Sequence, residues 1–272
     1  MITKRIYMCE DSIDGIFTAI YDAWSSRYGH DNIRIQVRQT GSENFNMELF
    51  SEYIYVTGEE EKTEKVSKAV MNKISEEAFE MICHAALSDE AWKGDSIYRF
   101  LILGFSIGPA IVNHLNNDTV LNIFNMNRIV SNEAHHFLGF VRFTEGKNKI
   151  LMSKIKPKND ILRLIAPHFA DRLNLEDFII YDEKRKTAVI HRSGFPWIYT
   201  LADNLNLDRF DELSEQEENF RLLWKTFFNT IAIEERKNFK LQRNNLPLRF
   251  RSNMLEFSSA DNEDTNESKK IL

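Results

Sequence analysis

Apolar residues change their spacing along the first half of the chain. Residues 33–37 alternate apolar and polar side chains, which is the period of a half-buried strand. Another short strand is expected at residues 4–9, with a helix after it. From residue 59 onward apolar residues recur at helical spacing in successive segments. The pattern predicts a mainly helical region with N-terminal strands over residues 1–136.

The second half returns to strand-like spacing. Residues 137–143 and 150–155 are predicted to form a β-hairpin around a turn that contains a glycine and an asparagine. An amphipathic helix follows, and further strands flank a turn at Glu183. We therefore expect an α+β region over residues 137–257, with a mixed or antiparallel sheet packed by helices. The whole chain is predicted to be an α+β protein.

A long helix is predicted near the end of this region. Ser214 and Glu217 have the spacing of a capping box, which marks a helix N-terminus. The apolar residues that follow recur at helical spacing and would form one stripe along the helix: Phe220, Leu223, Trp224, Phe227 and Ile231.

Composition is that of an ordinary soluble globular protein. Of 272 residues, 43% are hydrophobic and 28% are charged, and no apolar run reaches the length of a membrane span. The N-terminus has no secretory pattern, and Cys9 and Cys83 are in no metal or redox spacing, so a cytoplasmic protein with buried thiols is expected. The acidic residues 258–272 are expected to be disordered.

Positive charge is concentrated in one segment of an acidic chain. The net charge is −6, yet residues 219–251 carry eight Lys or Arg against two Glu. Cations neutralise phosphates, and Arg or Phe side chains can stack on bases, so a nucleic-acid surface is predicted. The alternative is a C-terminal strap whose bases pair with the acids of residues 201–218. The predicted binding residues are Arg236, Lys237, Lys240, Gln242, Arg243, Arg249 and Arg251, joined by Arg142, Arg172 and Arg185.

Catalytic chemistry has weaker support in the sequence. Glu133 and His136 would share a helix face, but no further ligand stands at a partner spacing, so no metal and no cofactor is expected. No nucleophile elbow, phosphate loop or triad pattern occurs. If the protein is an enzyme, its catalytic groups would be Glu133, His135, His168 and Asp182. For Asp182, a hairpin turn with a contact to Arg185 is favoured over a functional role.

Four long blocks resemble a bacterial family of DNA repair or DNA metabolism proteins. They are "YMCEDSIDGIFTAIYDAW", "NRIVSNEAHHFLGFVRF", "PHFADRLNLEDFIIYDEKR" and "LWKTFFNTIAIEERKNFKLQRNNLPLRF". His136 stands where the family usually has Arg. The resemblance implies a radical S-adenosylmethionine protein as a neighbour, and similar domains are fused to uracil-DNA-glycosylase-like domains. This chain lacks the cysteine triplet of the radical enzymes, so it cannot be that partner itself.

Three hypotheses remain open at this point. The chain is a DNA-binding accessory protein in a repair or modification system, with DNA and a radical S-adenosylmethionine protein as partners. Alternatively, it is a DNA-acting enzyme of unknown reaction. As a third hypothesis, it is a scaffold that binds a partner enzyme and never touches DNA.

Overall fold

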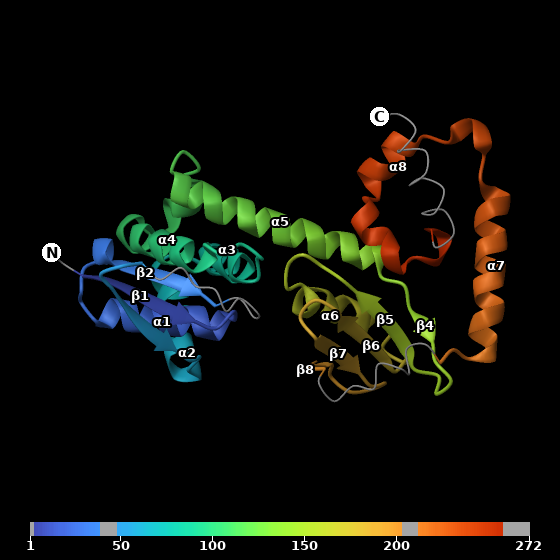
Figure 1. The fold of residues 1–272 in the computed structure, drawn as a ribbon, viewed down its shortest axis with the longest axis horizontal. Helices are drawn as coiled ribbons and strands as arrows, with labels where there is room; N and C mark the ends of the chain where they lie inside the picture. The colour runs from blue at the N-terminus through green and yellow to red at the C-terminus, as the bar shows by residue number, and fades with distance from the viewer. Residues whose placement is uncertain (1–2, 39–47, 203–211, 258–272) are drawn as a thin grey trace. The chain divides into compact units, whose positions relative to one another are not determined.

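The chain forms two compact units, each with its own β-sheet (Figure 1). The computed structural model describes residues 3–38, 48–202 and 212–257, so the acidic segment 258–272 lies outside the described residues. Helices and two sheets are mixed along the chain, which confirms the predicted α+β class. The units consist of Met1–Glu133 with Lys158–Asp160, and of Ala134–Pro157 with Ile161–Leu272.

The first unit is built on a three-stranded parallel sheet. Its strands are β1 (Lys4–Cys9), β2 (Ile33–Val37) and β3 (Ser51–Val56), in the order β2-β1-β3. The central strand β1 is buried from Ile6 to Cys9, as expected of a parallel strand that is covered on both faces. The edge strand β2 alternates, with every second residue buried.

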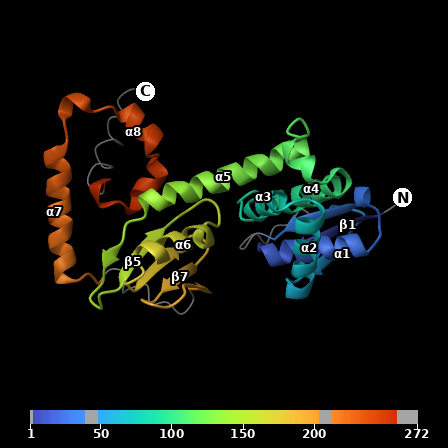
Figure 2. The same ribbon diagram turned by 180° about the vertical axis from the view of Figure 1, so that it is seen from behind.

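Helices cover both faces of this sheet, with α1 and α4 on opposite sides (Figures 1 and 2). A Cβ atom on Gly94, in the first turn of α4, would lie only 3.0 Å from the Cγ2 of Ile35. Glycine at this position therefore permits the close approach of α4 to β2. Ser12 caps α1 by accepting a hydrogen bond from the Gly15 amide. The helices are α1 (Ile13–Ser25), α2 (Glu60–Lys73), α3 (Glu76–Ala86), α4 (Lys93–Ile107) and the start of α5 (Asp118–Phe140).

The second unit contains a mixed five-stranded sheet in the order β4-β5-β6-β7-β8. β5 and β6 are parallel because α6 (Leu162–Arg172) makes the crossover between them, and the other neighbours are antiparallel. The strands are β4 (Thr144–Glu145), β5 (Leu151–Ile155), β6 (Phe178–Asp182), β7 (Thr187–His191) and β8 (Ile198–Leu201).

The rest of the second unit is helical. The predicted helix is confirmed as α7 (Glu215–Ile231), and the Ser214 side chain accepts from the Glu217 amide at its N-terminus. After α7 come α8 (Phe239–Asn245) and the 3-10 helices η5 (Leu248–Asn253) and η6 (Leu255–Phe257). None of the helices within the described residues has the length and apolar content that a membrane span requires.

The predicted hairpin is wrong at its first strand. Residues 137–140 continue α5, and only β4 pairs with β5 in an antiparallel ladder. The rings of His136 and Phe140, four residues apart, stack with centroids 5.8 Å from each other, which is a helical and not a strand neighbourhood. Helical packing of these aromatic residues therefore overrides the strand-like composition of the segment.

Candidate nucleic-acid interface

An aromatic cluster joins the C-terminal segment to the end of α5. Phe250 on η5 is only 5% exposed. Its ring centroid lies 5.1 Å from Phe137 and 5.2 Å from Phe140, and His136 packs edge-on at 5.5 Å. Ring pairs at these separations add stability beyond their buried area. Phe250 therefore anchors the C-terminal segment to α5, and this ring is not available to stack on a base.

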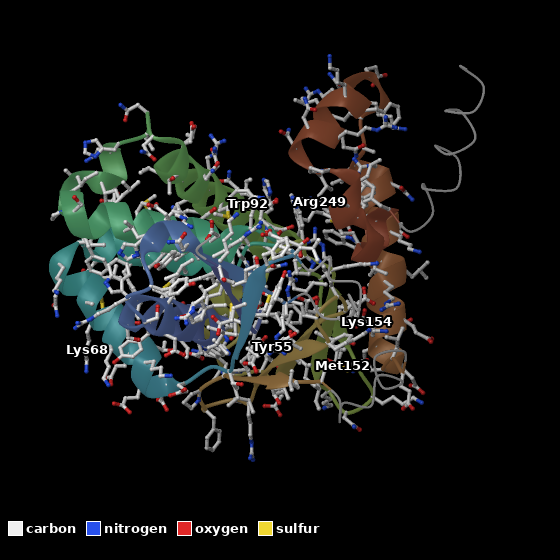
Figure 3. The ribbon with its side chains drawn as sticks, turned by 60° about the vertical axis from the view of Figure 1, so that its left-hand side comes forward. Tyr55, Lys68, Trp92, Met152, Lys154 and Arg249 are labelled. Atoms are coloured by element: carbon white, nitrogen blue, oxygen red, sulfur yellow. The ribbon has the colours of Figure 1, made fainter. Side chains whose placement is uncertain are left out.

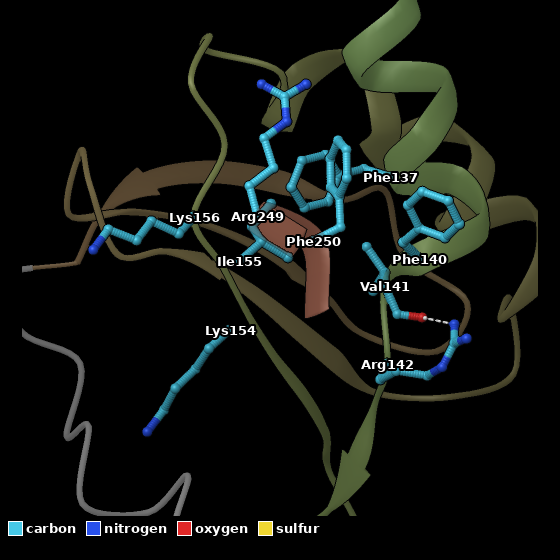
Figure 4. Close-up of a pocket in the computed structure, with 9 residues that line it drawn as sticks. All are labelled: Phe137, Phe140, Val141, Arg142, Lys154, Ile155, Lys156, Arg249 and Phe250. Atoms are coloured by element: carbon cyan, nitrogen blue, oxygen red, sulfur yellow. Dashed lines mark hydrogen bonds between the residues drawn. The ribbon is translucent and has the colours of Figure 1, made fainter. Parts of the chain in front are cut away.

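Four cations surround the cluster: Arg142, Lys154, Lys156 and Arg249 (Figure 4). They come from three places in the chain: Arg142 follows α5, Lys154 and Lys156 lie on and just after β5, and Arg249 lies on η5. Figure 3 labels Lys154 and Arg249. The hollow between them is about 10 Å³, which is room for one water molecule at most. Such a hollow is too small for a substrate, so the region is a charged surface and not a reaction pocket.

The lysines and Arg249 point outward in different directions from the aromatic cluster (Figure 4). Charges that diverge cannot all contact one small anion, but they can contact successive phosphates of a chain. The guanidinium carbon of Arg249 lies 4.6 Å from the centroid of the Phe250 ring, a cation–π contact that orients the exposed side chain. The buried Phe250 ring thus holds the Arg249 guanidinium at the surface.

Arg142 has a structural role at the end of α5. Its Nη1 donates to the Gly139 carbonyl at 2.9 Å, which satisfies a free carbonyl at the helix C-terminus. Its Nη2 forms a 2.9 Å ion pair with the largely buried Glu256 of η6. This ion pair connects η6 to the end of α5. The main role of Arg142 is therefore to fix these two elements to each other.

Four further predicted cations are exposed before and along α8: Arg236, Lys237, Lys240 and Arg243. The segment is held in shape by Asn238, whose side chain accepts from the Leu241 amide and caps α8. Gln242 is half-buried in the same helix. Arg172, at the end of α6, is also exposed. Phe239 is exposed as well, so the predicted stacking on bases is sterically open to it and closed to Phe250.

Two predicted phosphate ligands are turned inward instead. Arg251 is 4% exposed, donates to the Leu246 carbonyl at 3.2 Å and lies over the Phe257 ring, so its burial removes it from any contact with a phosphate. Arg185 pairs with Asp182 at 3.1 Å and donates to the Pro157 carbonyl. These internal contacts argue against both arginines as phosphate ligands, and the sequence pattern carries no information on burial that would have shown it.

The two candidate carboxylates each bind a loop. Glu133 is buried in α5 and accepts hydrogen bonds from the amides of Lys158 and Asn159 and from the Asn159 side chain, at 2.7–3.0 Å. Asp182 is fully buried and accepts from the amides of Lys184 and Arg185. Carboxylates with several such bonds hold their loops in place, which is the turn role that the sequence left open for Asp182.

The candidate histidines lie on the surface of the second unit. His135 is exposed on α5, and His168 is exposed on α6 with its ring against Phe169. Within the described residues, no group of three or more His, Cys, Asp or Glu side chains is placed to hold a metal ion. The catalytic set therefore stays a prediction.

Sequence reasoning missed Lys154 and Lys156. Two lysines at alternate positions at the end of a predicted strand were the available signal. Of the acids expected to pair with the basic segment, Glu217 pairs with Arg221 of that segment, whereas Glu212 pairs with Lys147 outside it. Residues 203–211 of that acidic stretch lie outside the described residues.

Comparison with known proteins gives a family but no activity. The profile of a family described as a domain of unknown function (DUF4130) matches residues 91–256, more than half of the chain. The match includes α5, the mixed sheet, α7, α8 and η5. No curated protein matches the chain.

Proposed function

We propose a function from the chain's own geometry, because the chain belongs to the DUF4130 family, whose description names no activity. The protein binds the phosphate backbone of DNA through its second unit and acts as an accessory protein in a DNA repair or modification system. The observation that carries this proposal is the group of cations around a buried aromatic cluster, with a hollow of only about 10 Å³ between them. The repair context rests on the resemblance of the four sequence blocks.

The charge distribution supports DNA as the ligand. Lys154, Lys156 and Arg249 diverge from the aromatic cluster. The exposed cations of and before α8 add positive charge to the same unit. A net negative protein can bind DNA in this way, because a local positive field attracts phosphates over roughly one Debye length, about 8 Å at physiological salt. Affinity from such contacts is largely independent of base sequence.

A triple variant tests this assignment. Lys154→Ala, Lys156→Ala and Arg249→Ala together should weaken DNA binding, because each substitution removes a cation that neutralises a phosphate. The slope of log affinity against log salt should become shallower by about 0.9 for each phosphate that is no longer neutralised. Fluorescence anisotropy with labelled single-stranded and double-stranded DNA measures both quantities.

The matched control removes three exposed cations from the first unit: Lys4→Ala, Lys68→Ala and Arg128→Ala. The overall charge change is the same, so equal losses of affinity in the two variants would mean that only net charge matters. Unchanged DNA affinity in the triple variant would show that these three cations do not form the DNA-binding surface.

A second candidate function, partner binding, is favoured by α7. The apolar stripe predicted for this helix is exposed along its length, at Phe220, Leu223, Trp224, Phe227 and Ile231. Large exposed apolar patches commonly mark protein interfaces. We propose that α7 contacts a partner protein, for which the resemblance implies a radical S-adenosylmethionine enzyme.

Gel filtration of the two purified proteins tests this second candidate. The Phe220→Ser and Phe227→Ser double variant should fail to co-elute with that enzyme, whereas the triple cation variant should still co-elute. If the stripe variant co-elutes as the wild type does, α7 is not the contact.

A further inference from the structure

The first unit contains an apolar groove that the proposed DNA surface does not use. It lies between α1, α2 and α4, all within the same compact unit, and encloses about 440 Å³. Pockets for small molecules usually measure about 300–1,000 Å³ and are lined mainly by apolar and aromatic side chains. This groove has the size of a ligand site, in contrast to the hollow among the cations of the second unit.

The floor of the groove is rigid and aromatic. Ile20, Val66 and Leu101 are buried beneath it. Trp24 forms an edge-to-face pair with Phe105 at 5.3 Å and also packs against Tyr98 at 6.0 Å. Side chains held by several ring contacts stay in place without a ligand, so the site is pre-formed and binding costs little ordering entropy.

One rim of the groove is positively charged. Lys65, Ala69 and Lys73 follow one another at four-residue spacing on α2, so they share one face of the helix. The two lysines are eight positions apart, which corresponds to about 12 Å along the helix axis. Ala69 leaves an opening between two long cationic side chains.

Among the described residues, no acidic side chain lines the groove. The nearest competitor is Glu61, which pairs with Lys65 at 2.6 Å in an exposed contact between successive helical turns. Exposed pairs of this kind contribute little because solvent screens them, so a ligand can displace Glu61 from Lys65. Lys65 also lies 5.6 Å from the Tyr21 ring centroid, which places its charge over the groove's edge.

We propose that this groove binds a small apolar anion, a molecule with a flat or chain-like hydrocarbon body and one acidic head. The body lies over Trp24 and Phe105, and the head enters beside Ala69 between the two lysines. The charge of the rim selects an anion over a neutral or cationic molecule. The volume favours a small molecule over a partner helix, and the site is independent of the DNA surface.

Anilinonaphthalene sulfonate, an aromatic anion that fluoresces in apolar sites, is the probe. The full-length protein should bind it saturably at one groove site, and phenylnaphthylamine, which has the same rings without the sulfonate, should bind about tenfold more weakly. The Lys65→Glu and Lys73→Glu double variant should weaken sulfonate binding by about tenfold and leave the neutral probe unaffected. Ala69→Phe should block both probes by filling the opening.

Lys68→Glu is the matched control, because Lys68 is exposed on α2 but does not line the groove. It should leave both probes unaffected. Fluorescence that is the same in the wild type, the double lysine variant and Ala69→Phe would place the probe elsewhere, such as on α7, and overturn the proposal. Equal affinity for both probes would also overturn it. If Ala69→Phe does not fold, the double lysine variant and the neutral probe still decide the outcome.

Discussion

At the scale of single residues, the buried acids serve the backbone. Glu133 and Asp182 each accept hydrogen bonds from two consecutive amides of a loop. A buried carboxylate needs such partners, since leaving it unpaired would cost several kcal/mol. Acids near histidines in a sequence resemble catalytic groups, but the same residue types also hold turns, and only the amide contacts distinguish the two roles.

Removing the Glu133 carboxylate should therefore loosen one loop. We expect Glu133→Ala to lower the free energy of local opening at Lys158 and Asn159 by about 1–3 kcal/mol, because two amides lose their buried acceptor. Amide hydrogen exchange at these two residues measures the effect. Asn132→Ala, exposed on the same helix, is the control and should change nothing. Normal exchange in Glu133→Ala together with a loss of DNA processing would instead favour a catalytic carboxylate.

The cysteines make a second residue-scale prediction. Burial raises the pKa of both the Cys9 and Cys83 thiols from 9.0 to about 12. Both should react slowly with Ellman's reagent at pH 8 in the folded protein and rapidly in urea. In the unfolded chain the thiols ionise near their ordinary pKa, so unfolding should become easier as pH rises from about 9 toward 12. Rapid labelling of the folded protein would contradict this burial.

At the scale of elements, local signals predicted the helices well. The capping residues Ser12 and Ser214 begin helices as expected, because an N-cap acts on amides two or three residues away. The end of α5 was missed. There Phe137 and Phe140 pack against Phe250, which lies more than a hundred residues later in the sequence. Strand-like composition cannot reveal such a distant partner.

The stripe of α7 provides an element-scale prediction. Since Phe227 is exposed, Phe227→Ser should change the free energy of unfolding by less than about 0.5 kcal/mol. Phe178→Ala, in the fully buried interior of β6, should cost about 3–5 kcal/mol. Thermal unfolding of both variants gives the comparison. A destabilisation at Phe227 as large as that at Phe178 would mean that α7 packs against the rest of its unit in solution.

At the scale of the whole molecule, the sequence shows that charge is segregated, but it does not show which charged side chains the fold exposes together. The basic segment and the α+β class could be predicted because they depend on local composition and periodicity. The burial of Arg251 and the contribution of Lys154 and Lys156 could not, since both depend on which elements meet in the fold. The candidate surface is thus partly the predicted segment and partly β5.

DNA binding is the central claim, and its salt dependence tests it most directly. Fluorescence anisotropy of the full-length protein should be measured with single-stranded, double-stranded and uracil-containing DNA across a salt series. If three to five phosphates are contacted, log affinity should fall linearly against log salt with a slope of about −3 to −4.5 on double-stranded DNA. Absence of binding at low salt would contradict the account and leave partner binding through α7 as the function to pursue.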